Sequence, residues 1–342
     1  MTAMSSDKST IVDDLDLRIT HSLQVSPRAP FALIGTVLGV SEQTVARRYR
    51  RLRDARAVRV VGLVDPSAFG QQNWSLRLAC RPDASEQIAR ALARRDDVHW
   101  VALLSGGTEV VCVLRARSAQ ERDHLLLRQL PRTAQIDSIT AYGVLHVFRG
   151  GMIRDWRVGG SLLTAEQEAR LLESATARDN RPASLTPADE PMLQELLRNG
   201  RATYAALRAT ANDGRSDAQL RRRVEELTAA GVLTFDVDVD DAQFGRPVRA
   251  YMSLTVTPAQ LQAVGDALSE HDAVRYAAAV TGPASVVANT AFSSVDDLYR
   301  FVAEDLGKLD GVAQVQVLPI SKAIKQGGAC ATEPDQTAWP TR

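Results

Sequence analysis

The sequence predicts an α+β protein built from two repeats, each a winged helix-turn-helix followed by a ferredoxin-like βαββαβ sandwich domain. Residues 45–70 align with residues 220–245 at a constant offset of 175 residues. Apolar residues at helical spacing precede each aligned segment, and short alternating strands and helices follow it. A shared period of this length indicates duplication of a whole two-domain unit rather than a solenoid.

The segment between the two copies has the composition of a connector. Its ends are rich in Gly, Pro, Ser and charged residues, and Thr164 with Gln167 forms a capping-box pattern that predicts a short helix. The expected organisation is an N-terminal tail (1–12), a winged helix-turn-helix (13–65), an α+β effector and dimerisation domain (66–150), a linker with a short helix (151–184), a second winged helix-turn-helix (185–240), a second α+β domain (241–326) and a C-terminal tail (327–342).

Composition excludes several classes of protein. The 342 residues carry a formal net charge of zero, so the whole molecule is not a polycation that coats nucleic acid. No apolar run approaches the roughly 20 residues that span a membrane, and the N-terminus lacks the apolar core of a secretory signal. Three scattered cysteines do not form a disulfide framework or a zinc site, and Cys80 and Cys112 are expected to be buried thiols. We therefore expect a cytoplasmic protein without a membrane partner, metal or cofactor.

The first third of each repeat has the spacing of a helix-turn-helix. In the first repeat, Leu15, Ile19 and Leu23 form the apolar stripe of one helix, and a second short helix runs from Pro30 to Leu38. The segment 38–41 is the predicted turn, in which Gly39 can adopt a positive φ and Ser41 can cap a third helix. The apolar run 58–64 is expected to form the wing.

The third helix carries an arginine-rich surface. Seven arginines and only two acidic residues lie between Ser41 and Val60. Arginine can pair with phosphate and can also donate two hydrogen bonds to a guanine edge. The alternative is a solvated, salt-bridged helix surface without a ligand. The candidate DNA-binding residues are Ser41, Gln43, Thr44 and Arg47 at the start of the helix, with Arg48, Arg50 and Arg51 contacting phosphates or in part structuring the helix.

The corresponding helix of the second repeat is less basic. Arg221 and Arg222 are candidate DNA-binding residues there, but acidic residues balance the arginines of segment 216–235. The apolar stripe of Leu220, Val224 and Leu227 is intact, so this helix should fold. Two extra residues, placed around 212–214, fall in the turn and can tilt the helix. Whether the second repeat contacts DNA stays open.

The last two thirds of each repeat read as βαββαβ, a sheet with both helices on one face. Expected strands of the first repeat are 74–80, 98–104, 109–114 and 136–144, with helices at 85–94 and 118–130. Those of the second repeat are 249–256, 274–280, 286–291 and 312–318, with helices at 259–269 and 295–309. The sheet face opposite the helices needs a packing partner in each copy. We therefore expect the two sheets to pack on each other and form an internal pseudo-dimer.

These residues resemble the Lrp/AsnC family of feast/famine transcriptional regulators, in a tandem-fused form. The strings LDLRITHSL and IGTVLGVSEQTVARRYRRLRDARAVRVVGLVDPSAFG carry the resemblance, together with the SGGTEV turn of the sheet domain. It spans nearly the whole chain, twice. The resemblance implies binding of pseudo-palindromic DNA by dimers or larger assemblies, and sensing of amino acids or related small molecules between sheet domains.

The resemblance also implies effector-binding residues. The family's sensing loop reads Gly-x-x-Asp. Residues 106–109 correspond to this loop in the first repeat and keep a carboxylate. Residues 282–285 correspond to it in the second repeat and have no carboxylate, which argues against amino-acid recognition by the second pocket. The first repeat has Arg56 where the family usually has the glycine that the second keeps as Gly231. The effector-binding residues implied are Ser105, Gly106, Thr108 and Glu109 in the first repeat, and Gly282 and Ser285 in the second.

The function expected from the sequence is sequence-specific DNA-binding transcriptional regulation, without catalytic residues. Double-stranded DNA, an amino-acid-class effector and further copies of the chain are the expected partners. Two alternatives stay open. Such double units are also similar to siroheme decarboxylases of haem biosynthesis, which carry paired His and Arg residues, whereas the five histidines here lie far apart in sequence. A partner-only regulator without DNA binding is the other alternative.

Overall fold

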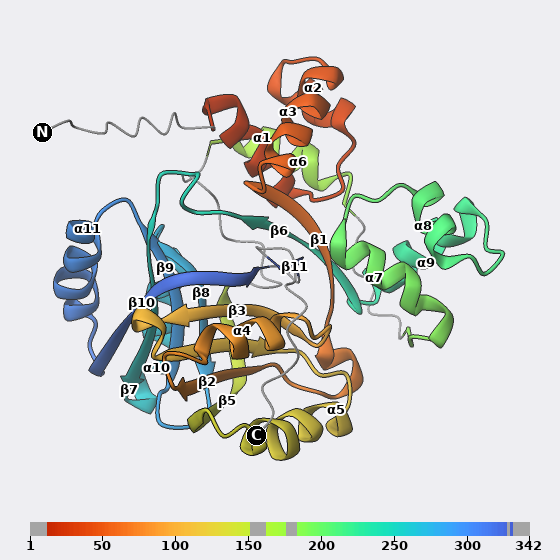
Figure 1. Cartoon of the computed structure of the whole chain (residues 1–342). Helices are drawn as coiled ribbons and strands as arrows, with labels where there is room; N and C mark the ends of the chain where they lie inside the picture. The colour runs from red at the N-terminus through yellow and green to blue at the C-terminus, as the bar shows by residue number, and fades with distance from the viewer. Residues whose placement is uncertain (1–11, 151–161, 176–182, 327–328, 331–342) are drawn as a thin grey trace, which may run out of the picture.

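The computed structural model describes residues 12–150, 162–175, 183–326 and 329–330. Two groups of helices are joined by a two-stranded ribbon, and a large curved sheet lies on the other side of this ribbon (Figure 1). The tails predicted at 1–12 and 327–342 lie outside the described residues, apart from Val12 and the short strand β11 (Ala329–Cys330).

The first helical group contains α1 (Asp14–Val25), α2 (Phe31–Leu38) and α3 (Glu42–Asp54). These bounds agree with the sequence prediction. α2 ends at Gly39, whose φ of 71° is the left-handed conformation expected at the turn. Ile19, Leu23, Ile34, Val45 and Leu52 are completely buried and form the centre of the shared core.

A fourth helix, α6 (Ala165–Leu172), packs on this group, as Figure 1 also shows. The predicted capping box of Thr164 and Gln167 is present. Leu171 is fully buried in the core of the first group, and the Gln167 side chain donates a hydrogen bond of 2.8 Å to the Val37 carbonyl at the end of α2. Residues 162–175 of the expected linker therefore form part of the first helical group, while 151–161 and 176–182 lie outside the described residues.

The second helical group contains α7 (Glu190–Arg198), α8 (Tyr204–Ala211) and α9 (Asp217–Ala229), preceded by a 3₁₀ turn (Pro187–Asp189). Its core is built from Met192, Leu196, Leu207, Leu220 and Leu227. The turn between α8 and α9 covers residues 212–216, whereas the turn of the first group covers 39–41. The two additional residues are thus where the sequence placed them, and Asn212 adopts the left-handed conformation with a φ of 44°.

The predicted wing is wrong. β1 (Val58–Val64) does not form a hairpin within its own helix-turn-helix but pairs antiparallel with β6 (Leu233–Val239) of the second group, with Val61 opposite Asp236. Both faces of β1 are largely buried, so its backbone groups need a hydrogen-bonding partner. The next strand along the chain, β2 (Trp74–Cys80), belongs to the large sheet, and β6 supplies the partner instead.

Arg56, just before β1, is a site of local backbone strain. Its φ is 57°, and Gly231 before β6 has a φ of 74°. A non-glycine residue pays a steric penalty in this region that glycine avoids, although glycine loses more backbone entropy on folding. Arg56→Gly is expected to raise the free energy of unfolding by up to about 1 kcal/mol, measured by urea denaturation. Gly231→Ala, the matched change in the opposite direction, should lower it, and equal stability of Arg56→Gly and wild type would contradict the argument.

The large sheet is made of two sets of strands. The first set is β2 (Trp74–Cys80), β3 (Val98–Leu104), β4 (Glu109–Leu114) and β5 (Ile136–Arg149), with helices α4 (Ser85–Ala93) and α5 (Ala119–Asp123). The second is β7 (Val248–Val256), β8 (Val274–Val280), β9 (Val286–Phe292) and β10 (Val312–Gln326), with α10 (Leu261–Glu270) and α11 (Val295–Arg300). π-Helical turns, His124–Gln129 and Phe301–Asp305, extend α5 and α11. Each set has the predicted order βαββαβ.

The two sets close into one barrel. β5 pairs with β8, and β10 pairs with both β3 and β7, so the eight strands form a continuous ring. β5 and β10 run past their predicted ends, and these extra residues make the pairings between the sets. The barrel interior is filled at its middle by buried side chains from both sets: Ala102, Val111, Tyr142, Tyr251, Ala278 and Val287.

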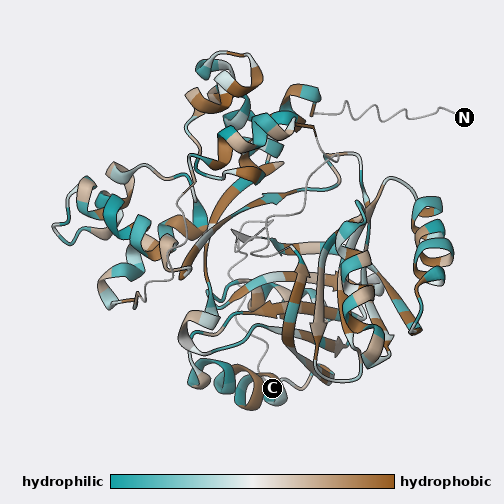
Figure 2. Ribbon diagram, turned by 180° about the vertical axis from the view of Figure 1, so that it is seen from behind, coloured by the Kyte–Doolittle hydropathy of each residue, from teal (hydrophilic) through white to brown (hydrophobic). Residues whose placement is uncertain are grey.

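Apolar residues concentrate in the strands of the ribbon and barrel, and polar residues on the peripheral helices (Figure 2). The helices of the barrel cover its outside, where Leu76, Leu78 and Ile88 pack in the core of the first set. Cys80 and Cys112 belong to this core as free thiols, as predicted, and burial raises the pKa of each to about 12. Among the residues that the structure describes, no helix is long and apolar enough to cross a membrane.

Candidate functional site

α3 is held in place by a cap and an apolar face. The Ser41 hydroxyl caps the helix by accepting a hydrogen bond of 3.2 Å from the Thr44 backbone N–H. Val45, Tyr49 and Leu52 point into the core at spacings of four and three residues. The predicted roles of Ser41 and Thr44 are therefore structural as well: their hydroxyl oxygens lie 2.9 Å apart at the exposed start of the helix.

The outward face of α3 carries free polar side chains. Gln43, Arg47 and Arg50 are exposed and lie four and three residues apart, on one side of the helix opposite the core. Side chains in this arrangement can enter a major groove, with the amide and guanidinium groups facing base edges. Ser41 and Arg51 are exposed as well, but Ser41 caps the helix and Arg51 pairs with Asp16, so Gln43, Arg47 and Arg50 are the candidates on α3 whose exposed side chains have no such role.

Arg48 and Arg51 turn back toward α1. The Arg48 guanidinium lies 3.1 Å from the Asp16 carboxylate and also pairs with Asp13, and Arg51 pairs with Asp16 from one turn further along the helix. The hydrogen bond from Arg48 lowers the pKa of Asp13 against the opposing effect of burial. Both arginines thus clamp α3 to the start of α1, and part of the basic charge counted in the sequence is neutralised within the fold.

α9 presents a different surface. Arg222 is exposed at the position equivalent to Arg47, but Ala218 and Glu225 replace Gln43 and Arg50 on the same face. Arg221 lies over the Tyr204 ring, with its guanidinium carbon 5.1 Å from the ring centre. The outward face of α9 therefore carries one basic and one acidic side chain, and no amide at its first position.

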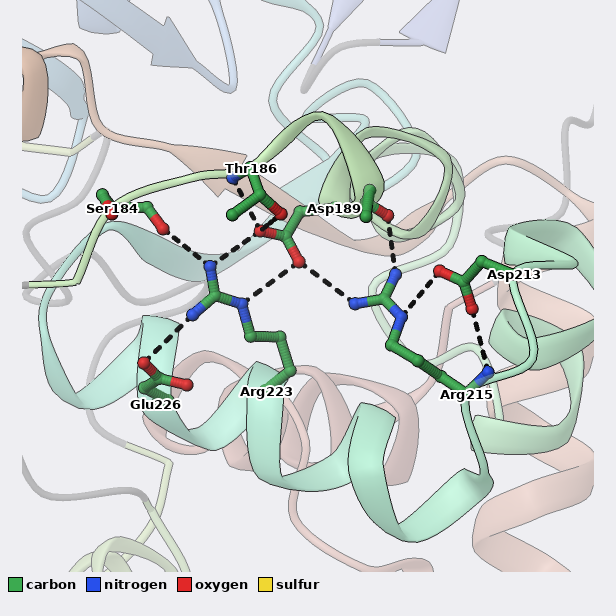
Figure 3. Close-up of polar contacts among 8 residues, drawn as sticks. Ser184, Thr186, Asp189, Asp213, Arg215, Arg223 and Glu226 are labelled. Carbon is green, nitrogen blue, oxygen red and sulfur yellow. Dashed lines mark hydrogen bonds and ion pairs between the residues drawn. The ribbon is translucent and has the colours of Figure 1, made fainter.

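A buried carboxylate, Asp189, organises the second helical group (Figure 3). It accepts a hydrogen bond of 2.7 Å from Arg223 of α9 and one of 3.1 Å from Arg215 in the longer turn. It also accepts a hydrogen bond from the Thr186 backbone N–H. Burial raises the pKa of Asp189, but the hydrogen bonds from Arg223 and Thr186 outweigh it and bring the pKa to about 2. The Arg223–Asp189 pair is the counterpart of Arg48–Asp16 in the first group.

Two arginines bind the helical groups to each other. Arg28, after α1, donates a hydrogen bond of 2.5 Å to the Gly200 carbonyl of the second group. Arg201 makes the reciprocal contacts, donating to the Pro27 and Ala29 carbonyls at 2.7 and 2.8 Å. Each guanidinium also lies over two aromatic rings of the opposite group, with Arg28 above Tyr204 and Phe235 and Arg201 above Phe31 and Tyr49. This exchange fixes the separation of α3 and α9.

The loops predicted to bind an effector lie at the barrel end away from the ribbon. A cavity of about 270 Å³ is lined there by Glu109 and by Pro283 and Ala284, so the structure brings the two predicted loops together. Glu109 is not free, however, because Arg77 donates to both of its carboxylate oxygens. Ser285 bonds to the backbone of Val256 at 3.0 Å.

The remaining loop residues do not line that cavity. The Gly106 backbone N–H donates a hydrogen bond of 2.8 Å to the Ser321 hydroxyl, and the Thr108 hydroxyl donates one of 3.2 Å to the Ser105 carbonyl. Gly282 has a φ of 101°, which suits glycine, and packs against the Tyr142 ring. Ser105, Gly106, Thr108 and Gly282 therefore shape the loops in this structure.

A larger cavity, which the sequence did not predict, lies between the ribbon and the near end of the barrel. Its volume is about 660 Å³, and its lining comes from β1 and β6 as well as from strands of both sets. His99 of β3 and Arg115, which follows β4, line it together with Tyr276 of β8. Burial, and then the charge of Arg115, hold the pKa of His99 well below its ordinary value. The sequence signal was a polar residue at each strand end, in VHWVALL and VCVLRAR.

The described residues bring no three His, Cys, Asp or Glu side chains together as a metal site. Hydrogen-bonding and charged groups are available at the surface of α3 and in the cavities described above.

Comparison with known proteins identifies both kinds of domain. Residues 12–53 match the AsnC-type helix-turn-helix domain, and residues 249–330 match the Lrp/AsnC ligand binding domain. An HTH-type transcriptional regulator of Pyrococcus horikoshii is 24% identical over 155 residues, which cover 45% of this chain and 97% of the relative. The chain therefore carries the DNA-binding and ligand-binding domains of Lrp/AsnC-type transcriptional regulators.

A second group of similar proteins has another activity. The siroheme decarboxylase NirDL subunit of Paracoccus denitrificans is 27% identical over 269 residues, covering 75% of this chain and 77% of the relative. A crystal structure of the siroheme decarboxylase NirDL superimposes with a TM-score of 0.56 at 12% identity, covering 92% of this chain and 93% of that one. At this identity the superposition shows a shared fold.

Proposed function

We propose that the chain is a sequence-specific DNA-binding transcriptional regulator that responds to an amino acid or a related small effector. The carrying observation is the exposed face of Gln43, Arg47 and Arg50 on a capped helix after a Gly-containing turn. The match of residues 12–53 to the AsnC-type helix-turn-helix domain supports this role. The HTH-type regulators among the relatives support it further.

We further propose that the chain is a tandem-fused form, with two helix-turn-helix and ligand-sensing units. The repeated element order, the equivalent pairs Arg48–Asp16 and Arg223–Asp189, and the reciprocal exchange of Arg28 and Arg201 support this reading. In it α3 reads bases, and α9 contributes less because of Ala218 and Glu225. The protein works in the cytoplasm as a homo-oligomer that places several copies of α3 along the duplex.

The test is binding of the purified chain to its own upstream DNA and to a random duplex, across a salt series. We expect tighter binding to the upstream DNA and a steep loss of affinity with salt, because each phosphate contact releases counterions. Absence of binding to either duplex at low salt would overturn the proposal. In that event a porphyrin titration followed by absorbance separates a siroheme-decarboxylase-like enzyme from a partner-only regulator.

A further inference from the structure

The cavity between the ribbon and the barrel has the properties of a ligand site. We propose that it binds an organic monocarboxylate with an apolar body, and that Arg115 recognises the carboxylate. This site is distinct from the predicted effector loops, which lie at the other end of the barrel. The proposal concerns ligand binding alone and does not depend on DNA recognition.

The size and the apolar lining of the cavity determine which kind of ligand can fit. A volume of about 660 Å³ lies within the range of pockets that enclose small organic molecules. Apolar side chains approach it from both walls: Trp100, Val147 and Ile320 from the barrel, and Val61 and Phe235 from the ribbon. Such walls favour a hydrocarbon or aromatic group over a small inorganic ion.

Arg115 supplies a buried cation without a protein partner. Its Nε and Nη1 atoms are buried and make no hydrogen bond. Two neighbouring arginines differ, since Arg59 pairs with Asp238 at 2.8 Å and Arg275 pairs with Asp241 at 2.6 Å, whereas Arg249 adds a further positive charge to the cavity lining. A buried guanidinium with unused donors is costly for the folded protein, and a carboxylate matches its planar fork. A carboxylate ligand would relieve that cost.

Uncharged polar groups surround the cation. The lowered pKa of His99 keeps its imidazole neutral. The Nδ1 atom of this ring is buried and makes no hydrogen bond. Burial raises the pKa of Tyr276 to about 12, so its phenol stays protonated and can donate. The side-chain oxygen of Asn289 is also buried and unbonded. The Tyr276 phenol can donate to the second oxygen of a carboxylate, and the Asn289 oxygen can accept from an N–H or O–H group beside it.

Acidic residues limit the charge that the cavity accepts. The carboxylates of Asp65 and Asp236 face Arg115 closely enough to raise its pKa, although burial is the larger effect and lowers it. Asp238 and Asp241 line the same cavity within their ion pairs. A phosphate or a polycarboxylate would be repelled by these four carboxylates, whereas the charge of a single carboxylate can be balanced by Arg115, with Arg249 as a second cation of the lining. An amino acid, with its ammonium toward the acidic side, belongs to the accepted class.

Three probes of one shape test the recognition of charge: 3-phenylpropionate, L-phenylalanine and 2-phenylethylamine, which lacks the carboxylate. Thermal unfolding of the full chain is followed at millimolar concentrations of each. We expect 3-phenylpropionate to raise Tm by about 2 °C or more, because a ligand that binds only the folded state stabilises it. L-Phenylalanine shows whether an ammonium is tolerated. No rise with either carboxylate above that with 2-phenylethylamine would overturn the proposal.

Arg115→Met removes the cation while keeping a long side chain. We expect this variant without ligand to have a higher Tm than wild type, and to lose the response to 3-phenylpropionate. If Arg115 had a structural partner, Tm would fall instead. Arg115→Gln serves the same purpose should the methionine variant not fold. Arg132→Met, which removes an exposed charge outside the cavity, is the control and should keep the full response. A response retained by both Arg115 variants would overturn the assignment.

Discussion

Arg47→Ala is expected to weaken binding to the specific DNA site by about 1–3 kcal/mol, which corresponds to roughly five- to 150-fold in Kd. Arg47 is exposed on the outward face of α3 between Gln43 and Arg50. Its guanidinium can donate two hydrogen bonds to a guanine edge, so its loss should also relax the preference for one base at one position. Fluorescence anisotropy with the specific duplex and with single-base variants of it measures both effects.

Two matched variants test whether the effect on DNA binding is specific to Arg47. Arg222→Ala removes the equivalent arginine of α9, where Glu225 replaces Arg50, and we expect a smaller loss of affinity. Arg48→Ala breaks the pairs with Asp13 and Asp16, and we expect it to reduce stability more than base preference. Equal weakening by Arg47→Ala on every duplex would reassign Arg47 to a phosphate contact. No weakening on any duplex would contradict its place in the interface.

Asp189→Asn is expected to lower the free energy of unfolding by about 2–3 kcal/mol at pH 7. The carboxylate is buried and accepts hydrogen bonds from Arg215, Arg223 and Thr186 (Figure 3). Its pKa of about 2 lies below the ordinary value of 3.8. A lowered pKa stabilises the fold above pH 4, and this contribution disappears as the pH falls through 2. A shift of this size corresponds to about 2 kcal/mol.

Urea denaturation of wild type and Asp189→Asn at pH 7, 4 and 2.5 measures this contribution. The difference between the two proteins should be full at pH 7, begin to shrink near pH 4 and become clearly smaller by pH 2.5. Asp213→Asn is the control, since Asp213 also pairs with Arg215 but lies on the surface of the turn, and we expect little change. A difference that stays constant over the whole pH range would show that the Asp189 carboxylate does not stay ionised below its ordinary pKa.

The helix-turn-helix elements could be predicted from the sequence because their signals are local. A glycine at position 39 and a serine at position 41 mark the turn and the cap, and the apolar stripe of Val45, Tyr49 and Leu52 marks the buried face. All of these residues act within a few positions of one another. The same holds for the helix that starts after Thr164, whose capping box is local although its packing against α1 and α2 is not.

Pairings between distant segments could not be predicted in this way. The apolar run 58–64 indicated a strand, but its partner Leu233–Val239 lies far along the chain, and the sequence contains no turn that joins them. Likewise, β5 and β10 extend to Arg149 and Gln326 because β8 and β3 continue the hydrogen-bonding ladder beyond each ferredoxin-like set. Barrel closure depends on both halves at once.

The sequence predicts a candidate DNA-binding surface on α3, but it did not show which of the arginines there pair within the fold. The seven arginines near α3 indicated a basic surface, yet Arg48 and Arg51 face the carboxylate of Asp16, which precedes them by 32 and 35 residues. Helical phase separates them from Arg47 and Arg50, and phase is uncertain until the cap is known. The cavity beside Arg115 could not be predicted, because its walls come from both halves and the polar residues at the ends of β3 and β4 do not by themselves indicate a shared cavity.

Barrel closure also dictates the order in which the chain can complete its fold during synthesis. β3 receives its second partner only when β10 arrives, and Ile320 of β10 pairs with Leu104 of β3. Until β10 leaves the ribosome, β3 and β7 each have an unpaired edge that can join another chain. A premature stop before residue 312 would therefore leave two open edges and favour aggregation. Pairing of β10 therefore completes the barrel, and contacts of such long range slow folding.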